Sequence, residues 1–239
     1  SIKRIATTFV LLSTAMILFL GGCTSQSQNT TPEGCFNFEN ISGTIMDYKV
    51  TACGSDVVIP SMIGGVIVEN IDEYAFHDKG LTMITIPDTV MSIGLFSFAS
   101  NQLSSVTIPS SLTNIHDHAF ADNQLIFVEL PNSVIRIGEY AFAYNDLASI
   151  ALPNSVTSIE KCAFFINKLT SISIPESVMN IGRRAFAHNE INIITIGADV
   201  NIDSTPTTMS VNEGFKSVYD SGGKSAGTYK YIGGVWVKE

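Results

Sequence analysis

The sequence predicts a solenoid, a fold in which short coils of one repeating length stack along an axis. The main observation is that three residue types each recur every 22 residues. The periodic prolines are Pro87, Pro109, Pro131, Pro153 and Pro175. The periodic phenylalanines are Phe76, Phe98, Phe120, Phe142, Phe164 and Phe186. The periodic asparagines are Asn101, Asn123, Asn145, Asn167 and Asn189. A fixed period of roughly 20–50 residues is typical of stacked repeats, in which each coil buries its apolar side against its neighbours.

Each coil is expected to contain one short strand. Leu103-x-x-Val106-x-Ile108 has apolar residues at alternate positions, so Val106 and Ile108 point inward and the residues between them point outward. Pro109 ends this strand, because proline has no N–H to donate to a neighbouring strand. The equivalent stretches begin at Leu125, Leu147, Leu169 and Ile191. Stacking these strands predicts a parallel sheet on one face of the solenoid, with short turns or helical segments on the other.

The periodic phenylalanines and asparagines are interpreted as structural. One phenylalanine in every coil predicts a stacked row of rings in the core, behind the sheet. A cofactor-binding cluster of aromatic residues is the alternative. The asparagines are expected at coil corners, where a buried amide can satisfy backbone groups of the next coil that would otherwise be unpaired.

The repeat resembles the BspA-like leucine-rich repeats of bacterial surface proteins and of some protists. Residues 58–196 carry the pattern IPxSVTxIGxxAFxxNxLTSI, and residues 154–159 and 167–172 fit it closely. The departures are Lys79, His116, Glu160 and Gly197. The resemblance implies a leucine-rich-repeat solenoid that is exposed at the cell surface, binds proteins and often mediates adhesion.

Residues 1–22 have the pattern of an export leader. Lys3 and Arg4 precede an apolar run that ends at Leu20, and small residues follow. Leu20 to Cys23 resembles the lipobox of bacterial lipoproteins. This resemblance implies that Cys23 is lipidated and becomes the new N-terminus, so that acyl chains anchor the protein in the membrane.

The alternative is an uncleaved transmembrane anchor, since residues 5–22 are just long enough to span a bilayer. Residues 23–34 are small and polar, which predicts a flexible tether. In Gram-negative lipoproteins, an Asp directly after the lipidated cysteine favours retention at the inner membrane. This chain has Thr24 at that position, which favours the outer membrane. We therefore expect a lipid-anchored protein of the bacterial cell envelope, at the outer membrane or the cell surface.

Both ends of the solenoid are expected to be covered by caps, because the terminal coils have no neighbour on one side. Residues 35–57 are expected to form the N-terminal cap and residues 197–239 the C-terminal cap, on either side of the repeats at 58–196. In the C-terminal segment, Gly233-Gly234 lies between two apolar stretches and predicts a β-hairpin. The alternative for this segment is a separate binding module.

The remaining cysteines are assigned different roles. Cys35 and Cys53 are 18 residues apart in the expected N-terminal cap. They can form a disulfide if the protein is exported. Cys162 lies at a variable position of the repeat and is expected to be an unpaired, partly packed thiol.

Composition and motifs argue against nucleic-acid binding and catalysis. The net charge is −9, with 13 Lys and Arg against 22 Asp and Glu, and affinity for phosphate backbones depends on cationic side chains. Residues 223–227 match G-x-S-x-G, but no His follows His188. His116-Asp117-His118 lacks an evident third metal ligand. We expect no enzyme activity, no cofactor and no metal.

The outward face of the strands is the expected binding surface. It is mostly Ser and Thr, with Met83, Phe127 and Ile193 as apolar exceptions and Glu129 beside Phe127. Exposed aromatic residues are candidate hot spots for a protein ligand, although isolated apolar residues are also ordinary on protein surfaces. The predicted function is therefore a protein-binding lipoprotein of the cell envelope, with adhesion to host or neighbouring-cell proteins as one use. The alternative is a structural or assembly lipoprotein without an external ligand.

Overall fold

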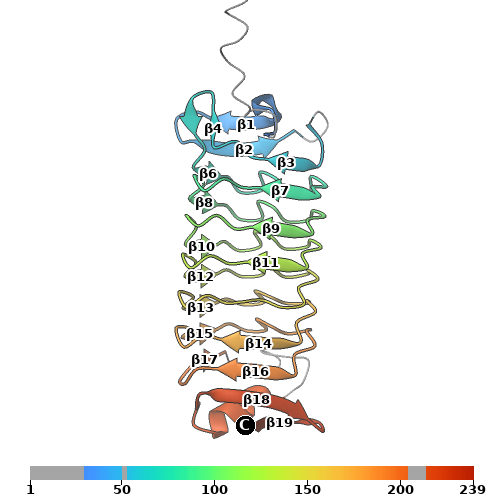
Figure 1. Cartoon of the computed structure of the whole chain (residues 1–239), viewed down its shortest axis with the longest axis vertical. Coiled ribbons are helices and arrows are strands. Elements are labelled where there is room, and N and C mark those ends of the chain that lie inside the picture. The colour runs from blue at the N-terminus through green and yellow to red at the C-terminus, as the bar shows by residue number, and fades with distance from the viewer. Residues whose placement is uncertain (1–29, 50–52, 204–213) are drawn as a thin grey trace, which may run out of the picture. The chain divides into compact units, whose positions relative to one another are not determined.

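The computed structural model describes residues 30–49, 53–203 and 214–239. Residues 31–239 form one compact unit, a solenoid of stacked coils with a hairpin at its C-terminal end (Figure 1). In these ranges no helix is both long enough and apolar enough to cross a bilayer. The predicted fold class, a leucine-rich-repeat solenoid with parallel strands and hairpin-like ends, is confirmed.

The first strand row is the one that the sequence predicts. Its members are β3 (Asp56–Val58), β7 (Met83–Thr85), β9 (Ser105–Thr107), β11 (Phe127–Glu129), β14 (Ser171–Ile174) and β16 (Ile193–Ile196). Their central residues are buried and the flanking ones exposed, as the alternation requires. The row is not the single sheet we expected, because only the pairs β3–β7, β9–β11 and β14–β16 are hydrogen-bonded as ladders. Residues 148–152 form no strand, which separates β11 from β14.

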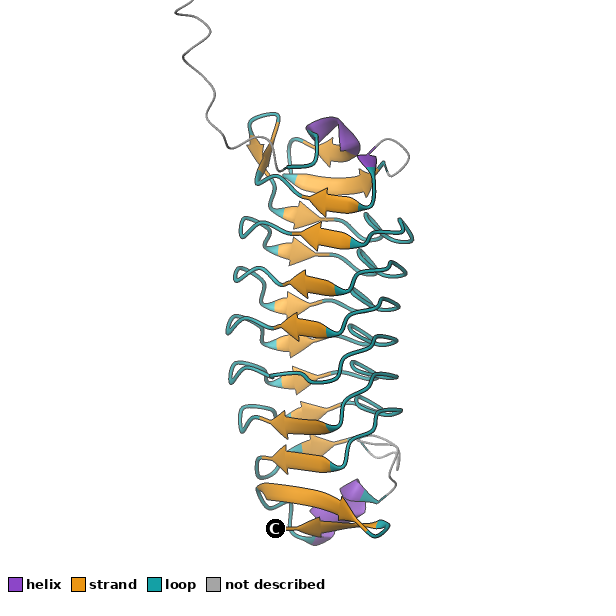
Figure 2. Cartoon of the chain, turned by 45° about the vertical axis from the view of Figure 1, so that its right-hand side comes forward, coloured by secondary structure: helices purple, strands orange, loops and turns teal. Residues whose placement is uncertain are grey.

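A second parallel row, which the sequence analysis missed, lies on another side of the coils (Figure 2). Its strands are β6 (Asn70–Ile71), β8 (Ser92–Ile93), β10 (Asn114–Ile115), β12 (Arg136–Ile137), β13 (Ser158–Ile159), β15 (Asn180–Ile181) and β17 (Asn201–Ile202). Each strand has two residues, of which only the isoleucine is buried. A strand this short shows no alternation, so its sequence cannot be distinguished from a turn.

The third side of each coil is a turn, with no helix between residues 72 and 203. Successive turns are joined by several backbone hydrogen bonds. The N–H groups of His118, Phe120 and Asp122, for example, donate to carbonyls of the following coil over 2.8–2.9 Å. Two non-glycine residues of every turn have positive φ, among them His118 at 58° and Asp122 at 54°. This backbone conformation is costly for side-chain-bearing residues, and the bonds between coils offset the cost.

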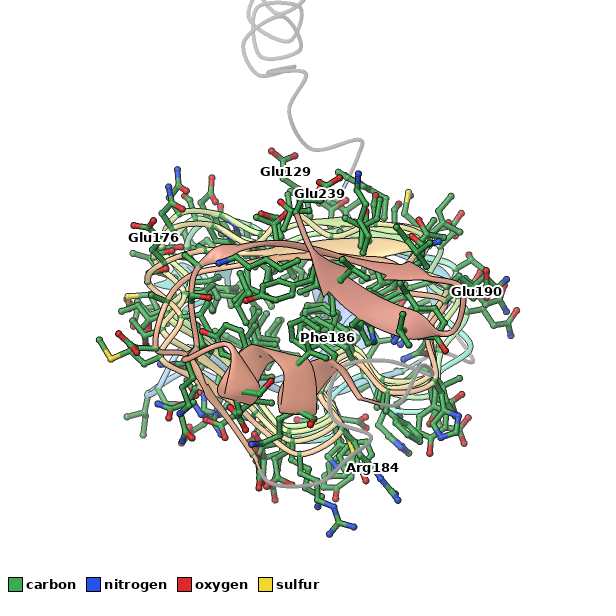
Figure 3. All side chains as sticks on the ribbon, turned by 90° about the horizontal axis from the view of Figure 1, so that it is seen from below. Glu129, Glu176, Arg184, Phe186, Glu190 and Glu239 are labelled. Carbon is green, nitrogen blue, oxygen red and sulfur yellow. A yellow bond between two sulfur atoms is a disulfide. The ribbon has the colours of Figure 1, made fainter. Side chains whose placement is uncertain are left out.

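The periodic phenylalanines form the predicted stacked row. All six are fully buried, and successive ring centroids are 5.0–5.6 Å apart with interplanar angles of 4–17°. Viewed along the axis, Phe186 lies inside the section while Glu129 and Arg184 project from opposite sides (Figure 3). The row is therefore the core of the solenoid, which confirms the structural interpretation of this periodicity.

The periodic asparagines are also buried, and they bridge neighbouring coils. Asn145 Oδ1 accepts from the N–H of Leu125 at 3.0 Å, and its Nδ2 donates to the carbonyl of Phe120 at 3.0 Å. Both partners belong to the preceding coil, so the predicted direction, toward the next coil, is wrong. The amide turns backward because the preceding coil's N–H at this corner has no backbone acceptor.

At the N-terminal end, β1 (Phe36–Glu39) and β2 (Thr44–Tyr48) form an antiparallel pair, and β2 pairs in parallel with β6. The Tyr48 ring stacks on Phe76 at 5.4 Å, so this segment continues the core by one layer. Cys35 and Cys53 form a disulfide with their Cα atoms 5.8 Å apart. A small antiparallel hairpin of β4 (Met62–Ile63) and β5 (Val66–Ile67) turns at Gly64-Gly65.

The end of the expected tether is packed rather than free. Thr31 is buried, its N–H donates to the Val58 carbonyl at 3.0 Å, and its Oγ1 accepts from the Val58 N–H at 2.9 Å. A 3-10 helix, η1 (Glu33–Cys35), follows. Residues 31–34 therefore belong to the folded unit, because polar side chains pair with the unpaired backbone of the first coil.

At the C-terminal end, α3 (Phe215–Ser221) leads to the predicted hairpin of β18 (Gly227–Ile232) and β19 (Val235–Lys238). Strand β18 pairs antiparallel with β16. Phe215 packs against Tyr229 and Trp236, with centroids 5.4 and 5.2 Å apart. The Tyr219 hydroxyl donates to the Gly197 carbonyl at 2.7 Å. Aromatic burial and this bond fasten the segment over the last coil.

Candidate functional site

The four residues predicted for the strand face lie on the surface of the first strand row. Met83, Phe127 and Ile193 are 47%, 55% and 37% exposed, and Glu129 is exposed as well. The structure does not bring the apolar three into one patch. Ser105 is the strand partner of Phe127, so the coil of Ser105 separates Phe127 from Met83. Ile193 lies beside Lys230 of the terminal hairpin. At about 4.8 Å per coil, Met83 and Phe127 are about 10 Å apart.

Phe127 and Glu129 instead border a hollow of about 440 Å³ between two coils. We call it the strand-face hollow. It is also lined by Asn132, Ala151, Leu152 and Pro153. It occurs where the first row is interrupted, next to residues 148–152, which form no strand. The hollow is therefore a local consequence of the missing strand.

The chemistry of the strand-face hollow is mixed. It combines the exposed Phe127 ring, the half-buried Leu152 and the Glu129 carboxylate, which forms no ion pair with a described residue. A ligand would therefore meet an apolar surface with an acidic edge. Leu152 was not predicted as a site residue, although the sequence carries one signal: Ala148 and Ala151 replace larger residues around it.

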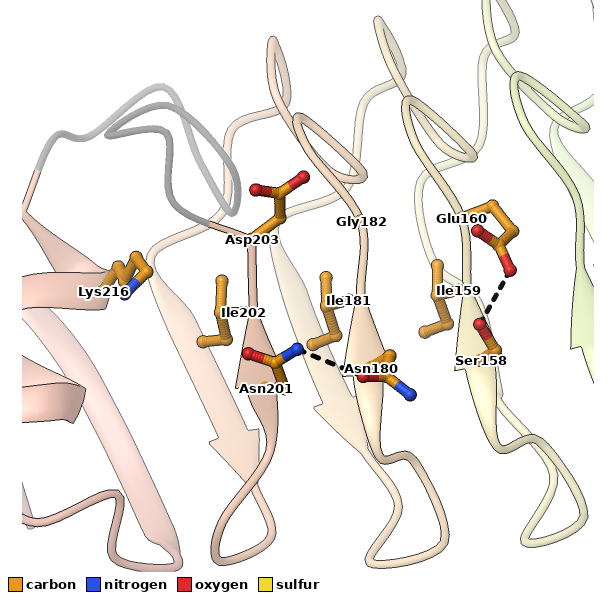
Figure 4. Close-up of a pocket in the computed structure, with 10 residues that line it drawn as sticks. All are labelled: Ser158, Ile159, Glu160, Asn180, Ile181, Gly182, Asn201, Ile202, Asp203 and Lys216. Atoms are coloured by element: carbon orange, nitrogen blue, oxygen red, sulfur yellow. Dashed lines mark hydrogen bonds between the residues drawn. The ribbon is translucent and has the colours of Figure 1, made fainter.

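A second, polar hollow of about 450 Å³ lies on the second strand row near the C-terminal end (Figure 4). Gly182 lies between Glu160 and Asp203 of the adjacent coils, and a Cβ at this position would come within 2.5 Å of the Lys161 backbone nitrogen, so the glycine allows the coils to pack closely. The Glu160 carboxylate accepts from Arg136 Nε at 3.1 Å and from Ser158 Oγ at 2.9 Å. Two charged groups of this hollow are therefore already bonded within the protein, because Lys216 also forms an ion pair with Asp220.

The motifs considered for catalysis and metal binding have structural contacts. Ser225 lies between α3 and β18, a helix-to-strand connection, whereas G-x-S-x-G needs a strand-to-helix turn. Its Oγ accepts from Lys238 Nζ at 2.9 Å. Asp117 accepts from the Glu139 N–H at 2.9 Å and pairs with Arg136 at 3.3 Å. Among the described residues, no three His, Cys, Asp or Glu side chains are grouped as a metal site.

Two cysteines remain. Cys23 and the rest of the expected leader lie outside the described residues. Cys162 is a free, buried thiol. A hydrogen bond with this thiol, together with burial, raises the pKa of Tyr140 to about 12. Cys162 thus packs against the Tyr140 side chain and is not accessible from solvent.

Comparison with known proteins agrees with the geometry. A family model described as "BspA type Leucine rich repeat region" matches residues 69–193 in six copies. No curated protein matches the sequence with significance. A leucine-rich cell surface protein from Faecalibacterium prausnitzii has a similar structure, with a TM-score of 0.52 and 25% identity; the match covers 90% of this chain and 60% of that protein. The present chain thus matches less than two thirds of it.

The leucine-rich-repeat protein of T. pallidum has a similar fold. Its TM-score is 0.54 and its identity 24%, over 76% of this chain and 85% of that one. At this identity the similarity concerns the fold alone.

Proposed function

Because the chain belongs to the BspA-type leucine-rich-repeat family, we propose that it is a lipoprotein of the bacterial cell envelope whose solenoid binds a protein through the strand-face hollow. The family and the cell-surface description of the F. prausnitzii protein support a protein-binding role at the surface. The observation that carries the choice of site is the exposed Phe127 ring at the edge of a hollow of about 440 Å³.

The shape and charge of the hollow define the partner that we propose. A partner side chain entering beside Phe127 and Leu152 would bury apolar surface, and aromatic anchors of this kind dominate binding energy at interfaces. Glu129 forms no ion pair with a described residue, so the contacting surface of the partner should be neutral or basic. Adhesion to host or neighbouring-cell proteins is the biological use that we propose.

The anchor is proposed from the sequence. Residues 1–22 would be removed and Cys23 lipidated, with residues 24–30 as the tether to the folded unit. The protein would then lie at the outer membrane or the cell surface.

The test is a pull-down with the full chain against matrix proteins and against the cell's own envelope proteins. The affinity of the captured protein is then measured for Phe127→Ser. Truncating a hot spot costs about 2 kcal/mol or more, so affinity should fall about 30-fold or more. The matched control is Ile135→Ser, which removes an exposed apolar residue immediately before β12. Equal affinities of the two variants and the parent would contradict the proposed site, and capture of envelope proteins alone would favour the assembly role.

A further inference from the structure

A second periodic set of aromatic side chains lies on the turns, on the side of the coils opposite the first strand row. Its members are Tyr74, Phe96, His118 and Tyr140, and we call it the turn-face stack. Successive ring centroids are 5.1, 4.2 and 4.7 Å apart, with interplanar angles of 4–14°. All four residues have positive φ, between 52° and 58°. Since neighbouring rings cover one another's faces, the ring edges are what the stack presents sideways.

Beside this stack lies a hollow of about 340 Å³, the turn-face hollow. Ala99 and Ala121 line it at a repeat position that is also alanine at 143 and 187 but is occupied by larger residues at His77 and Phe165. The small side chains leave a space that the ring edges of Phe96 and His118 border. The hollow therefore exists because alanine occupies this repeat position in consecutive coils.

One of the residues that line the hollow is an acid without a counter-ion among the described residues. Asp122 accepts a hydrogen bond from Ser100 Oγ at 3.2 Å and forms no ion pair within the described part of the chain. Two cations of the next two coils bind other carboxylates: Arg136 pairs with Asp117, and Lys161 with Glu139. The whole chain carries a net charge of −9.

The His118 imidazole would not repel a cation bound in this hollow, because it is uncharged near neutral pH. Burial is the main cause that lowers its pKa, against the opposing effect of Asp117 and Glu139. The imidazole is therefore neutral near pH 7. The lining then combines the Ala99 and Ala121 methyl groups and the Phe96 and His118 rings with His77, Ser100, Tyr144 and one carboxylate, that of Asp122.

We propose that the turn-face hollow binds an arginine or lysine side chain of a partner protein. The alkyl stem would lie on Ala99 and Ala121 against the ring edges, and the charged end would donate hydrogen bonds to Asp122. Lys and Arg side chains commonly lay their alkyl stems on an apolar surface while the charged end reaches a polar group. Hydrogen bonds between a cation and a carboxylate are stronger than those between neutral groups. This site is distinct from the strand-face hollow and goes beyond the function proposed above. Arg184, at the repeat position of the turn-face stack, projects from the side opposite Glu129 (Figure 3).

The probe is N-acetyl-arginine amide, titrated into the full chain in detergent with the alanine methyl groups isotopically labelled. The methyl signals of Ala99 and Ala121 should shift and saturate. N-acetyl-citrulline amide has nearly the same shape without the charge and should bind at least about tenfold more weakly. Equal shifts with both probes would overturn the proposal, because the hollow would then select for shape alone.

Two variants locate the site. Asp122→Asn keeps an acceptor for Ser100 and should weaken arginine-amide binding about tenfold. Asp78→Asn removes the same charge at an equivalent position with positive φ (51°), outside the hollow, and should bind like the parent. Ala121→Phe should fill the hollow and abolish binding, whereas Ala187→Phe, at the same repeat position outside it, should not. Unchanged binding by Asp122→Asn, or equal losses in each variant and its control, would refute the assignment.

Discussion

Replacing Asn145 by alanine should destabilise the solenoid by about 2–4 kcal/mol, and this magnitude can be worked from the contacts. The N–H of Leu125 donates to Asn145 Oδ1 at 3.0 Å and has no other acceptor in the described residues. A buried N–H left unpaired costs about 1–3 kcal/mol.

The carbonyl groups that accept hydrogen bonds from the Asn145 side chain lose less stabilisation than the Leu125 N–H. Asn145 Nδ2 donates to the carbonyls of Phe120, Phe142 and Ala143. Each of these carbonyls keeps a second donor; that of Phe142, for example, accepts from Asn167 Nδ2 at 2.9 Å. Their weakened bonding adds about 1 kcal/mol.

The assay is thermal unfolding followed by circular dichroism. A loss of about 2–4 kcal/mol corresponds to a midpoint lower by roughly 4–16 °C for a chain of this size. Asn154→Ala is the matched control, because Asn154 is exposed. Asn145→Asp adds a sharper test: it keeps the acceptor for Leu125 but directs a second oxygen at three carbonyls, so it should cost at least as much as alanine. A midpoint for Asn145→Ala equal to that of Asn154→Ala would refute the reasoning.

Three further changes test the core and the anchor. Phe142→Ala removes a fully buried ring from the middle of the stacked row and should cost about 3–5 kcal/mol in urea unfolding; a loss no larger than that of the exposed Tyr144→Ala would place Phe142 outside the core. Ser97→Ala should stabilise the protein by about 1 kcal/mol, since the Ser97 hydroxyl is buried without a partner in the described structure and the other coils have alanine there; a lower unfolding midpoint would argue against this. Cys23→Ser should leave an unprocessed precursor that does not incorporate labelled palmitate, and normal maturation would exclude the lipobox interpretation.

The parts of the fold that the sequence predicts are those in which one residue type recurs at one place. The Phe76 to Phe186 row and the alternation around Val106 both follow from inward-facing apolar residues at a fixed spacing. Gly233-Gly234 likewise identifies the terminal hairpin, because these glycines adopt positive φ values of 58° and 91°.

The parts that escaped prediction depend on backbone geometry that side chains do not reveal. Positive φ at Ile166 (52°) is unexpected for a β-branched residue, and only hydrogen bonding between stacked turns explains it. The two-residue strands of the second row leave no alternation to detect. The interruption at residues 148–152 removes hydrogen bonds between coils without changing the 22-residue period.

For the candidate sites the limits are similar. Alternation indicated that Phe127 and Glu129 point outward, and the structure places both on the surface. It could not indicate the hollow beside them, which depends on a missing strand. The turn-face stack had a usable signal, since Tyr74, Phe96, His118 and Tyr140 share one repeat position. That position was interpreted as merely variable because Cys162 and Arg184 also occupy it.

The most direct test of the central claim is photo-crosslinking from the strand face on intact cells. The full chain is expressed with p-benzoylphenylalanine at position 127, or at position 135 as the control. The proposed function predicts a covalent adduct with another protein from position 127 and none from position 135. The probe is also placed at the exposed Leu95 on the turns. Adducts from position 135 or 95 without any from position 127 would show that the strand face is scaffold and that the partner binds elsewhere.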